Sequence, residues 1–159
     1  MPTLSKDLAN YISGYVDGEG CFSVSFSQRP RLKVGWEVKP SFAVGQNYDR
    51  AEVLGLMQKY FACGFIRRDY SDKTLKYEVR GIDDLVFKVI PHFRRFSLRS
   101  SKRKDFILFE RICKKVKQHQ HLTSRGLRSI VILAYQMNNS GRRRYRKIDI
   151  LKSLSKMKI

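Results

Sequence analysis

The chain has 159 residues, of which 33 are Lys or Arg and 14 are Asp or Glu, so its formal net charge is +19 at pH 7. Hydrophobic residues make up 42% of it, which is enough to bury one core and excludes a compositionally disordered protein. Such a charge is most easily tolerated beside a polyanion and indicates a nucleic-acid partner, although charge alone does not distinguish a DNA-binding protein from a basic ribosomal or RNA-binding one. No run reaches the roughly 20 apolar residues of a membrane span, so we expect no membrane partner.

The cysteines argue against two further classes of protein. Cys21, Cys63 and Cys113 are odd in number and far apart, and they form no Cys-x-x-Cys pair, so a zinc knuckle or a disulfide framework is unsupported. Each is expected to pack as a reduced thiol, which fits an intracellular compartment.

The first predicted element is an amphipathic helix near the N-terminus. Its residues Leu8, Tyr11, Ile12 and Tyr15 recur at spacings of three and four, as one face of a helix requires. The sequence Asp-Gly-Glu-Gly at 17–20 is predicted to end this helix, because two glycines bracket an acidic residue there.

Two strands are predicted next. Residues 21–27 alternate strictly, with Phe22, Val24 and Phe26 on one face and serines on the other, which is typical of a half-buried strand. After a turn that contains a proline, residues 34–46 are predicted to form a second, longer strand.

A helix is then predicted at 49–61, followed by strands at 64–70 and 75–80 that flank the hairpin sequence Ser-Asp-Lys-Thr. Another helix is predicted at 83–93. The order is therefore helix, two strands, helix, two strands, helix.

Further segments follow this core. They are helices at 101–117 and 123–138, a basic linker at 140–147 and a short final helix at 148–157. We divide the chain into a domain of residues 1–138 and a basic C-terminal extension of residues 139–159.

Residues 12–20 read Ile-Ser-Gly-Tyr-Val-Asp-Gly-Glu-Gly and resemble the LAGLIDADG motif, with both of its glycines in place. The segment ends a predicted helix, leads directly into an alternating strand and occurs once in a strongly basic chain. Residues 44–46, Val-Gly-Gln, and residues 98–106, where a lysine precedes an aspartate and an aromatic residue, also resemble segments of this family. The resemblance covers about residues 4–138.

The resemblance implies an α+β fold, with an αββαββα core whose four-stranded antiparallel sheet forms a DNA-binding saddle, followed by C-terminal helices. It implies a site-specific homing endonuclease that hydrolyses phosphodiester bonds in both strands of a long duplex DNA target. The alternative is an intron maturase, or a DNA- or RNA-binding protein of the same fold that does not cleave. An HNH or GIY-YIG nuclease is unsupported, since His92, His119 and His121 form no metal-like arrangement.

The chemistry of the motif centres on Glu19. A carboxylate at the C-terminal end of a helix is disfavoured by the helix dipole, and a symmetry-related carboxylate beside it would add repulsion. Divalent cations relieve both, so we expect Glu19 to bind Mg²⁺ (or Mn²⁺), with the backbone near Gly18 as a further candidate ligand. A plain polar turn is the alternative for these residues, and the resemblance implies a structural role for Asp17.

Two more catalytic residues are implied by the resemblance. Gln46 would position the attacking water, and Lys102 would stabilise negative charge that develops on the phosphate. Arg103 or Lys104 are alternatives to Lys102, and a strand end facing solvent is the alternative for Gln46.

The outward strand residues mix donors and acceptors, including Glu37, Asp69 and Glu78, as contacts with base edges in a major groove require. A solvated sheet face is the alternative. The basic segment after residue 140 is expected either to contact phosphates or to be a flexible tail. The predicted DNA-binding residues are Ser25, Ser27, Lys39, Ser41, Arg50, Arg67, Lys76, Arg80, Arg142 and Arg143.

One motif copy in this sequence predicts a homodimer with a near-palindromic target, because two active-site carboxylates are needed. The helix at 8–16 would form the interface, since its small residues permit close approach. The predicted interface residues are Leu8, Ile12, Ser13, Gly14 and Tyr15. Double-stranded DNA is the expected partner, with the host intron RNA as a further candidate, in an organelle (mitochondrion or chloroplast) or a prokaryotic cytoplasm.

Overall fold

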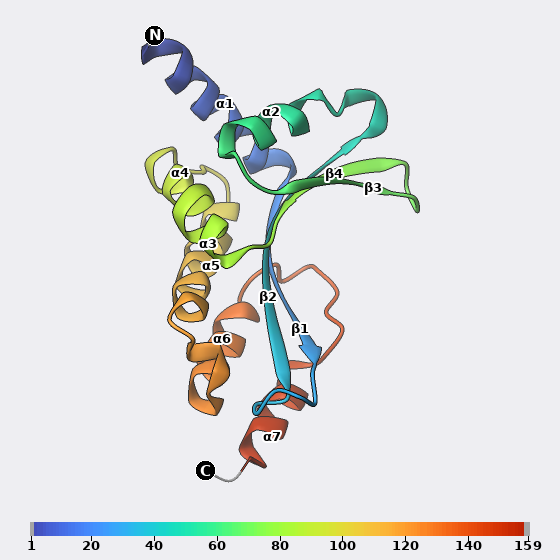
Figure 1. Cartoon of the computed structure of the whole chain (residues 1–159), viewed down its shortest axis with the longest axis vertical. Coiled ribbons are helices and arrows are strands. Elements are labelled where there is room, and N and C mark those ends of the chain that lie inside the picture. Colours follow the sequence, from blue (N-terminus) through green and yellow to red (C-terminus); the bar gives the residue numbers. More distant parts are fainter. Residues whose placement is uncertain (1, 158–159) are drawn as a thin grey trace. The chain divides into compact units, whose positions relative to one another are not determined.

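The structure, a computed structural model, describes residues 2–157 and has an α+β fold (Figure 1). The sheet order is β1-β2-β4-β3, and the predicted αββαββα order and four-stranded antiparallel sheet are confirmed. The elements in chain order are α1 (Pro2–Glu19), β1 (Gly20–Gln28), β2 (Trp36–Asn47), the 3₁₀ turn η1 (Tyr48–Arg50), α2 (Glu52–Phe61), β3 (Phe65–Asp69), β4 (Thr74–Val79), α3 (Ile82–Asp84), the π-helical η2 (Leu85–Val89), α4 (Ile90–Arg95), α5 (Lys102–Lys117), the 3₁₀ turn η3 (Gln120–Leu122), α6 (Ser124–Ala134) and α7 (Lys147–Ser155).

The predicted single helix at 83–93 is instead three helical segments with a π-helical middle, η2. Pro91 explains the change, because it has no backbone N–H to give to the carbonyl four residues earlier. The N–H of Ile90 bonds to the carbonyl of Leu85, five residues back, which is the π-helical pattern.

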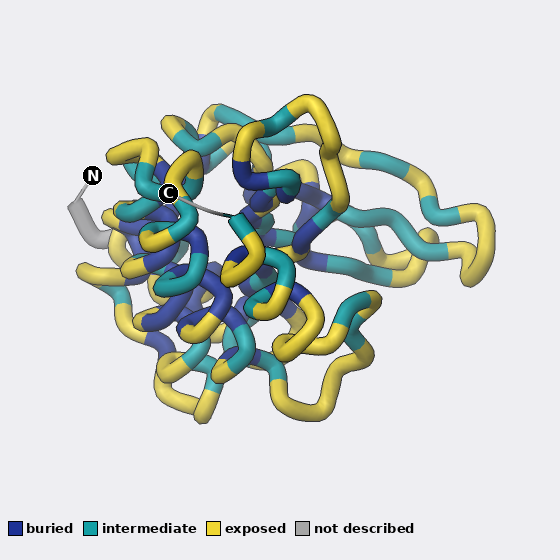
Figure 2. Tube along the Cα trace, turned by 90° about the horizontal axis from the view of Figure 1, so that it is seen from below, coloured by how far each residue is buried: buried dark blue, intermediate teal, exposed yellow. Residues whose placement is uncertain are grey.

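The chain forms two compact units: a first unit of residues 2–22 and 41–103, and a second unit of residues 23–40 and 104–157. Strands β1 and β2 each have residues in both units. Figure 2 shows exposed residues concentrated at the turns and buried ones within helices and strands. No helix of the described residues is long and apolar enough to cross a membrane.

Aromatic rings fill the core of the first unit. Phe42 stacks on Phe22 with ring centroids 5.3 Å apart and meets Phe93 edge-on at 5.6 Å. Phe61 of α2 lies within 6.4 Å of Tyr77 of β4, and all of these rings are buried. Burial of this much aromatic surface anchors α2 and α4 on the sheet face formed by alternate residues of β2 and β4.

The register of β2, β3 and β4 sorts their residues onto two faces. Phe42 pairs with Val79 and Val44 with Tyr77, so these residues face the core. The opposite face carries the residues that alternate with them, which are Ala43, Gly45, Phe65, Arg67, Asp69, Thr74, Lys76 and Glu78. This is the outward face predicted from the sequence for Arg67, Lys76 and Glu78.

The second unit packs the C-terminal helices around the ends of β1 and β2 that it contains. Trp36 donates a hydrogen bond of 2.8 Å from Nε1 to Oγ of Ser153 on α7, and its ring meets that of Tyr145 edge-on at 4.9 Å. Ile150 and Leu154 of α7 are buried. Residues 139–157 belong to this compact unit. The domain boundary at residue 138 remains a prediction.

Candidate functional site

The motif helix α1 runs into strand β1 without an intervening residue, and Gly20 permits that junction. A Cβ atom on Gly20 would lie 2.6 Å from Cγ1 and 2.9 Å from the carbonyl oxygen of Val16, so any larger residue would force a shift. Glu19, the last residue of α1, has an exposed side chain. Within the described part of the chain its carboxylate has no hydrogen-bond or ion-pair partner. A free anionic group therefore stands at the end of α1.

Asp17, two residues earlier, is fully engaged inside the first unit. Its carboxylate accepts hydrogen bonds from the backbone N–H groups of Arg99 at 2.9 Å and Ser100 at 3.0 Å, and from Oγ of Ser100 at 2.5 Å. Burial acts to raise the pKa of Asp17, but these hydrogen bonds and the charge of Lys102 outweigh it and lower the pKa below its usual value. Asp17 thus ties the end of α1 to the segment that leads into α5.

Lys102 is the first residue of α5, and its ammonium group lies at the end of α1. Nζ of Lys102 donates to the carbonyl oxygen of Val16 at 2.9 Å. This carbonyl belongs to the last turn of α1, where backbone oxygens lack helical partners and carry the negative end of the dipole. Arg103 and Lys104 are exposed, and their side chains have no partner among the described residues. Of the three predicted cations, Lys102 is the one bound to the motif helix.

Gln46 reaches α1 from the end of β2. Its Nε2 donates a short hydrogen bond to the hydroxyl of Tyr15, and its Oε1 accepts from the backbone N–H of Asn47 at 2.8 Å. Tyr15 and Gln46 also line a hollow together with Arg50. Glu19, Gln46 and Lys102 therefore come from three elements to the last two turns of one helix.

Among the described residues, one side of helix α1 is open at its two glycines. A Cβ atom on Gly14 or Gly18 would have no heavy atom within 4 Å, and Tyr11 on the same stripe is 53% exposed. Ile12 and Ser13 lie on the opposite side, inside the first unit, with 0% and 5% exposure. Among the predicted interface residues, Gly14 lies on the open side, Leu8 and Tyr15 are partly exposed, and Ile12 and Ser13 belong to the protomer's own core.

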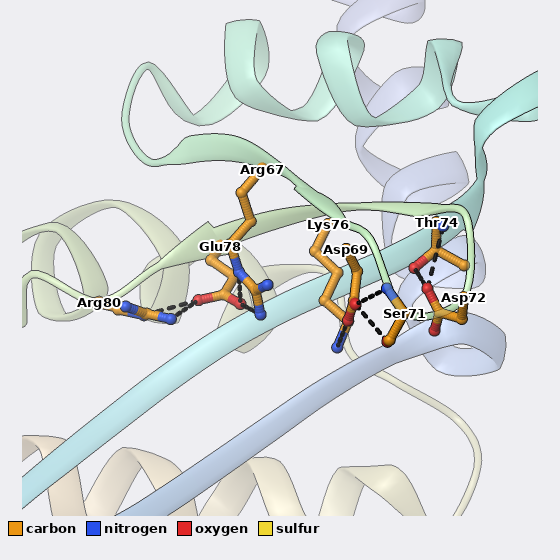
Figure 3. Close-up of polar contacts among 8 residues, drawn as sticks. All are labelled: Arg67, Asp69, Ser71, Asp72, Thr74, Lys76, Glu78 and Arg80. Carbon is orange, nitrogen blue, oxygen red and sulfur yellow. Dashed lines mark hydrogen bonds and ion pairs between the residues drawn. The ribbon is translucent and has the colours of Figure 1, made fainter.

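The polar residues of the sheet are organised by ion pairs (Figure 3). Arg67 and Arg80 both bond to Glu78, and Nζ of Lys76 lies 3.7 Å from Oδ2 of Asp69. In the second unit, Nζ of Lys39 lies 3.7 Å from Oε2 of Glu37. Ser25 is exposed, Ser27 and Ser41 are partly exposed, and Arg50 is exposed at the end of η1. The predicted contact residues of the sheet are thus accessible.

Arg143 has a different place from the one predicted. Its guanidinium donates to the carbonyl oxygens of Val24 at 3.1 Å, of Met137 at 3.4 Å and of Ala134, and it lies 4.4 Å from the ring centroid of Tyr135. Burial lowers the pKa of Arg143. Three of its five N–H groups are engaged by backbone oxygens inside the second unit, which favours a structural role over the predicted phosphate contact. Arg142 is exposed.

Two polar arrangements in the first unit were not anticipated from the sequence. Glu78, expected to face outward as an acceptor, has a side chain only 6% exposed and binds two arginines. His92 is buried, and its Nε2 and Nδ1 atoms form hydrogen bonds of 3.0 Å with Oγ of Ser13 and 2.8 Å with the hydroxyl of Tyr60. Strand alternation predicts which face of the sheet Glu78 lies on, but no sequence pattern predicts that both of its carboxylate oxygens are bound by arginines.

The chain is similar in sequence to proteins named as endonucleases. The chain is 32% identical over 123 residues to probable intron-encoded endonuclease 2 of Neurospora crassa, a match that covers 77% of this chain and 27% of that protein. It is 27% identical over 143 residues to the homing endonuclease I-ApeII of Aeropyrum pernix, covering 88% and 84%. The chain spans about a quarter of the length of the first curated relatives it matches.

Two solved structures of homing endonucleases superpose on more than nine tenths of this chain. The homing endonuclease I-TnaI superposes with a TM-score of 0.80 and 31% identity, covering 92% of this chain and 95% of that one. An archaeal intron-encoded homing endonuclease complexed with DNA superposes with a TM-score of 0.86 and 27% identity, covering 93% and 94%. A model of the LAGLIDADG endonuclease family matches residues 12–113. From its motif helix, its sheet and this match, the chain belongs to the LAGLIDADG endonuclease family.

Proposed function

We propose that the protein is a site-specific homing endonuclease that hydrolyses a phosphodiester bond in each strand of duplex DNA, with a divalent metal and as a homodimer. The observation that carries the proposal is the unpartnered carboxylate of Glu19 at the end of α1, where Lys102 and Gln46 are also attached. The net charge of +19 favours a polyanionic substrate. Relatives named as homing endonucleases support the same activity.

The residues at the end of α1 fit a hard divalent cation such as Mg²⁺ or Mn²⁺. Glu19 and the exposed backbone near Gly18 offer oxygen ligands, which these ions prefer. Among the described residues no group of three His, Cys, Asp or Glu could hold a metal, and the carboxylate of Asp17 is occupied. One protomer thus supplies a single carboxylate, and a second Glu19 from a second copy, with water and a DNA phosphate, would complete the site. When bound, the cation supplies activation of water and stabilisation of charge on the phosphodiester.

The protein's own groups then orient the reactants. Lys102 uses one N–H on the carbonyl of Val16, and its other two can donate to a phosphate oxygen as negative charge builds up there. Gln46 keeps one amide N–H and one lone pair beyond its bonds to Tyr15 and Asn47, so it can hold a water molecule in a fixed orientation. Both groups are fixed by contacts that exist before DNA arrives, which reduces reorganisation during the reaction.

The open side of α1 supports dimerisation. Gly14 and Gly18 are four residues apart on one face, so the backbones of two such helices can approach closely around a two-fold axis. Tyr11 and the partly exposed Leu8 would cover the contact. Isologous packing of α1 brings the two Glu19 carboxylates together and favours a near-palindromic target.

The proposed DNA-binding residues of each unit are those on the outward face of its own strands, together with Arg50 of η1 and Arg142 of the C-terminal segment. Arg143 is left out of this set, because its guanidinium is bound inside the second unit. The residues that remain are Ser25, Ser27, Lys39, Ser41, Arg50, Arg67, Lys76, Arg80 and Arg142. An intracellular location, in an organelle or a prokaryotic cytoplasm, is consistent with relatives that are intron-encoded or come from an archaeon.

The test is cleavage of a randomised duplex DNA library in Mg²⁺ by wild type and by Glu19→Gln. We expect sequence-selective double-strand cuts by wild type, and binding without cuts by the variant. Glu110→Gln, which removes the same charge from α5 in the second unit, is the matched control and should still cut. Wild type that binds RNA, including its host intron, and leaves all DNA uncut would instead support a maturase and overturn the proposal.

A further inference from the structure

Glu78 on β4 binds two arginines at once (Figure 3). Its Oε1 accepts from Nε and Nη2 of Arg67 at 2.9 and 2.7 Å, and its Oε2 accepts from Nε and Nη2 of Arg80, both at 2.7 Å. Strand register places Glu78 and Arg67 on the outward face, since Phe65 pairs with Glu78 and Arg67 pairs with Lys76, and Arg80 follows the last residue of β4. We call Arg67, Glu78 and Arg80 the arginine clamp.

The carboxylate of Glu78 is itself unable to read a base. Both of its oxygens are occupied, and its side chain is only 6% exposed, whereas Arg67 and Arg80 are 39% and 58% exposed. Burial of this carboxylate is compensated by four charge-assisted contacts. The charge of Glu78 therefore acts inside the protein, and the two guanidinium groups are what the surface presents.

Each guanidinium is left with one free edge. Of its five N–H groups, Nε–H and one Nη2–H are used on Glu78, which leaves both Nη1–H groups and the second Nη2–H. Within the described residues no acceptor is bonded to Nη1 of Arg67 or Arg80. The free edge presents two parallel donors, which match the O6 and N7 acceptors of guanine in the major groove. Adenine offers a donor at one of these places and is disfavoured.

Other contacts distinguish the clamp from the basic residues around it. The guanidinium of Arg80 also lies 5.3 Å from the ring centroid of Phe65, which restrains its plane. Lys76 has a single ion pair of 3.7 Å with Asp69 and no planar fork. Arg68 alternates to the other face of β3 and lies 5.2 Å from the ring centroids of Tyr48 and Tyr70. Only two cations of this hairpin are therefore held by a shared carboxylate among the described residues.

We infer that Glu78 is a specificity-determining positioning residue, which holds Arg67 and Arg80 so that each reads one guanine in every half-site of the DNA target. The inference rests on the proposed function. The inference predicts that affinity and specificity change in opposite directions in Glu78→Gln, because this substitution raises the net charge by one and also frees both arginines. Affinity for random duplex DNA should therefore rise and its salt dependence should steepen, while base discrimination falls.

The experiment is selection of bound sequences from a randomised duplex DNA library without divalent metal, followed by sequencing. We expect two guanine positions per half-site for wild type, the loss of one in Arg67→Ala and of the other in Arg80→Ala. In Glu78→Gln the guanine preference should fall at least about tenfold at both. Arg67→Lys keeps the charge without the fork and should lose the same position as Arg67→Ala. Arg68→Ala, from the same strand, is the control and should weaken binding to all sequences alike.

The outcomes separate the two proposals. Wild type that selects no duplex DNA would overturn the proposed function. Wild type that selects a site whose preferences are unchanged in Arg67→Ala and Arg80→Ala, both folded by circular dichroism, would overturn only the clamp. The single arginine variants keep Glu78 paired with the other arginine, so the inference is tested even if Glu78→Gln does not fold.

Discussion

Ser13 on α1 and His92 on α4 form a buried hydrogen bond, with 3.0 Å between Oγ of Ser13 and Nε2 of His92. The hydroxyl of Ser13 donates its one proton to the carbonyl of Phe96 at 2.7 Å, so it must accept from Nε2–H. Nδ1 of a neutral His92 is then an acceptor, and the hydroxyl of Tyr60 lies 2.8 Å from it. The chain from Tyr60 through His92 and Ser13 to Phe96 is satisfied in one direction only, with a neutral imidazole. It joins the motif helix to α2 and α4.

This arrangement predicts a loss of stability in mild acid. Burial lowers the pKa of His92 from 6.5 to about 4, so the unfolded chain binds more protons between these values and the free energy of unfolding rises with pH there. The contribution of His92 is complete above pH 6.5, decreases as pH falls toward 4, and amounts to about 3 kcal/mol. Urea unfolding of wild type and His92→Gln between pH 4.5 and 7.5 measures it.

In His92→Gln the free energy of unfolding should change less with pH than in wild type. His119→Asn is the control, because His119 is exposed and has a positive φ of 60° that asparagine tolerates. Parallel pH profiles for wild type and His92→Gln would show that His92 is not the group that titrates.

Gly14 of α1 and Gly20, the first residue of β1, should respond to substitution in opposite ways. Gly20→Ala places a methyl group against Val16 and should lower the free energy of unfolding by about 1–3 kcal/mol. Gly14→Leu meets open space in the protomer and gains helix propensity, so protomer stability should be kept while dimers dissociate. Thermal unfolding measures the first effect and sedimentation measures the second. A Gly14→Leu protein that remains dimeric would place the interface elsewhere than on α1.

Substitutions of the adjacent residues Arg142 and Arg143 should have different effects on stability and on DNA binding. Arg143→Gln removes donors from three backbone carbonyls and a stacking contact with Tyr135, and it should cost about 2 kcal/mol of stability. Arg142→Gln should change stability by less than about 0.5 kcal/mol but weaken DNA binding and reduce the salt dependence by about one counterion. Unfolding curves and salt titrations of DNA binding check both. Equal losses of DNA affinity with unchanged stability would return Arg143 to the DNA surface.

The order of helices and strands was predictable because the apolar period changes visibly along the chain. Residues 21–27 alternate with period two and α1 repeats at three and four, and both patterns are local. The π-helical turn before Pro91 was missed, since periodicity continues through it although a backbone donor is lost. Ile12 fits the apolar stripe equally well as core or as interface, and only tertiary contacts decide between them.

The motif allowed the residues of the candidate site to be predicted, but it did not allow the contacts between them to be predicted. Glu19, Gln46 and Lys102 are widely separated in sequence, and their attachment to one helix end depends on the fold. The inward turn of Arg143 follows no periodic pattern, because residues 139–146 form no helix or strand. The same holds for Glu78, because strand alternation predicts which face of the sheet it lies on but not the arginines that it binds.

The two acidic residues of the motif should have separable functions. Asp17→Asn replaces one carboxylate oxygen by an NH₂ group that faces the N–H donors of Arg99 and Ser100, and it should cost about 1–2 kcal/mol of stability. The pKa of Asp17 is lowered, so wild type holds this advantage above the unfolded value of 3.8 and loses it as pH falls through the folded pKa. The two proteins should therefore converge in stability at strongly acidic pH.

Glu19→Gln should show the reverse pattern. Its carboxylate has no partner within the described residues, so stability without metal should be unchanged or higher once a repulsive charge leaves the helix end. Bound Mg²⁺ stabilises only a folded protein that has its ligand, so the rise in Tm on adding Mg²⁺ should persist in Asp17→Asn and vanish in Glu19→Gln. If instead Asp17→Asn abolishes the Mg²⁺ effect at unchanged Tm, Asp17 is the metal ligand and its hydrogen bonds to Ser100 must break when the cation binds.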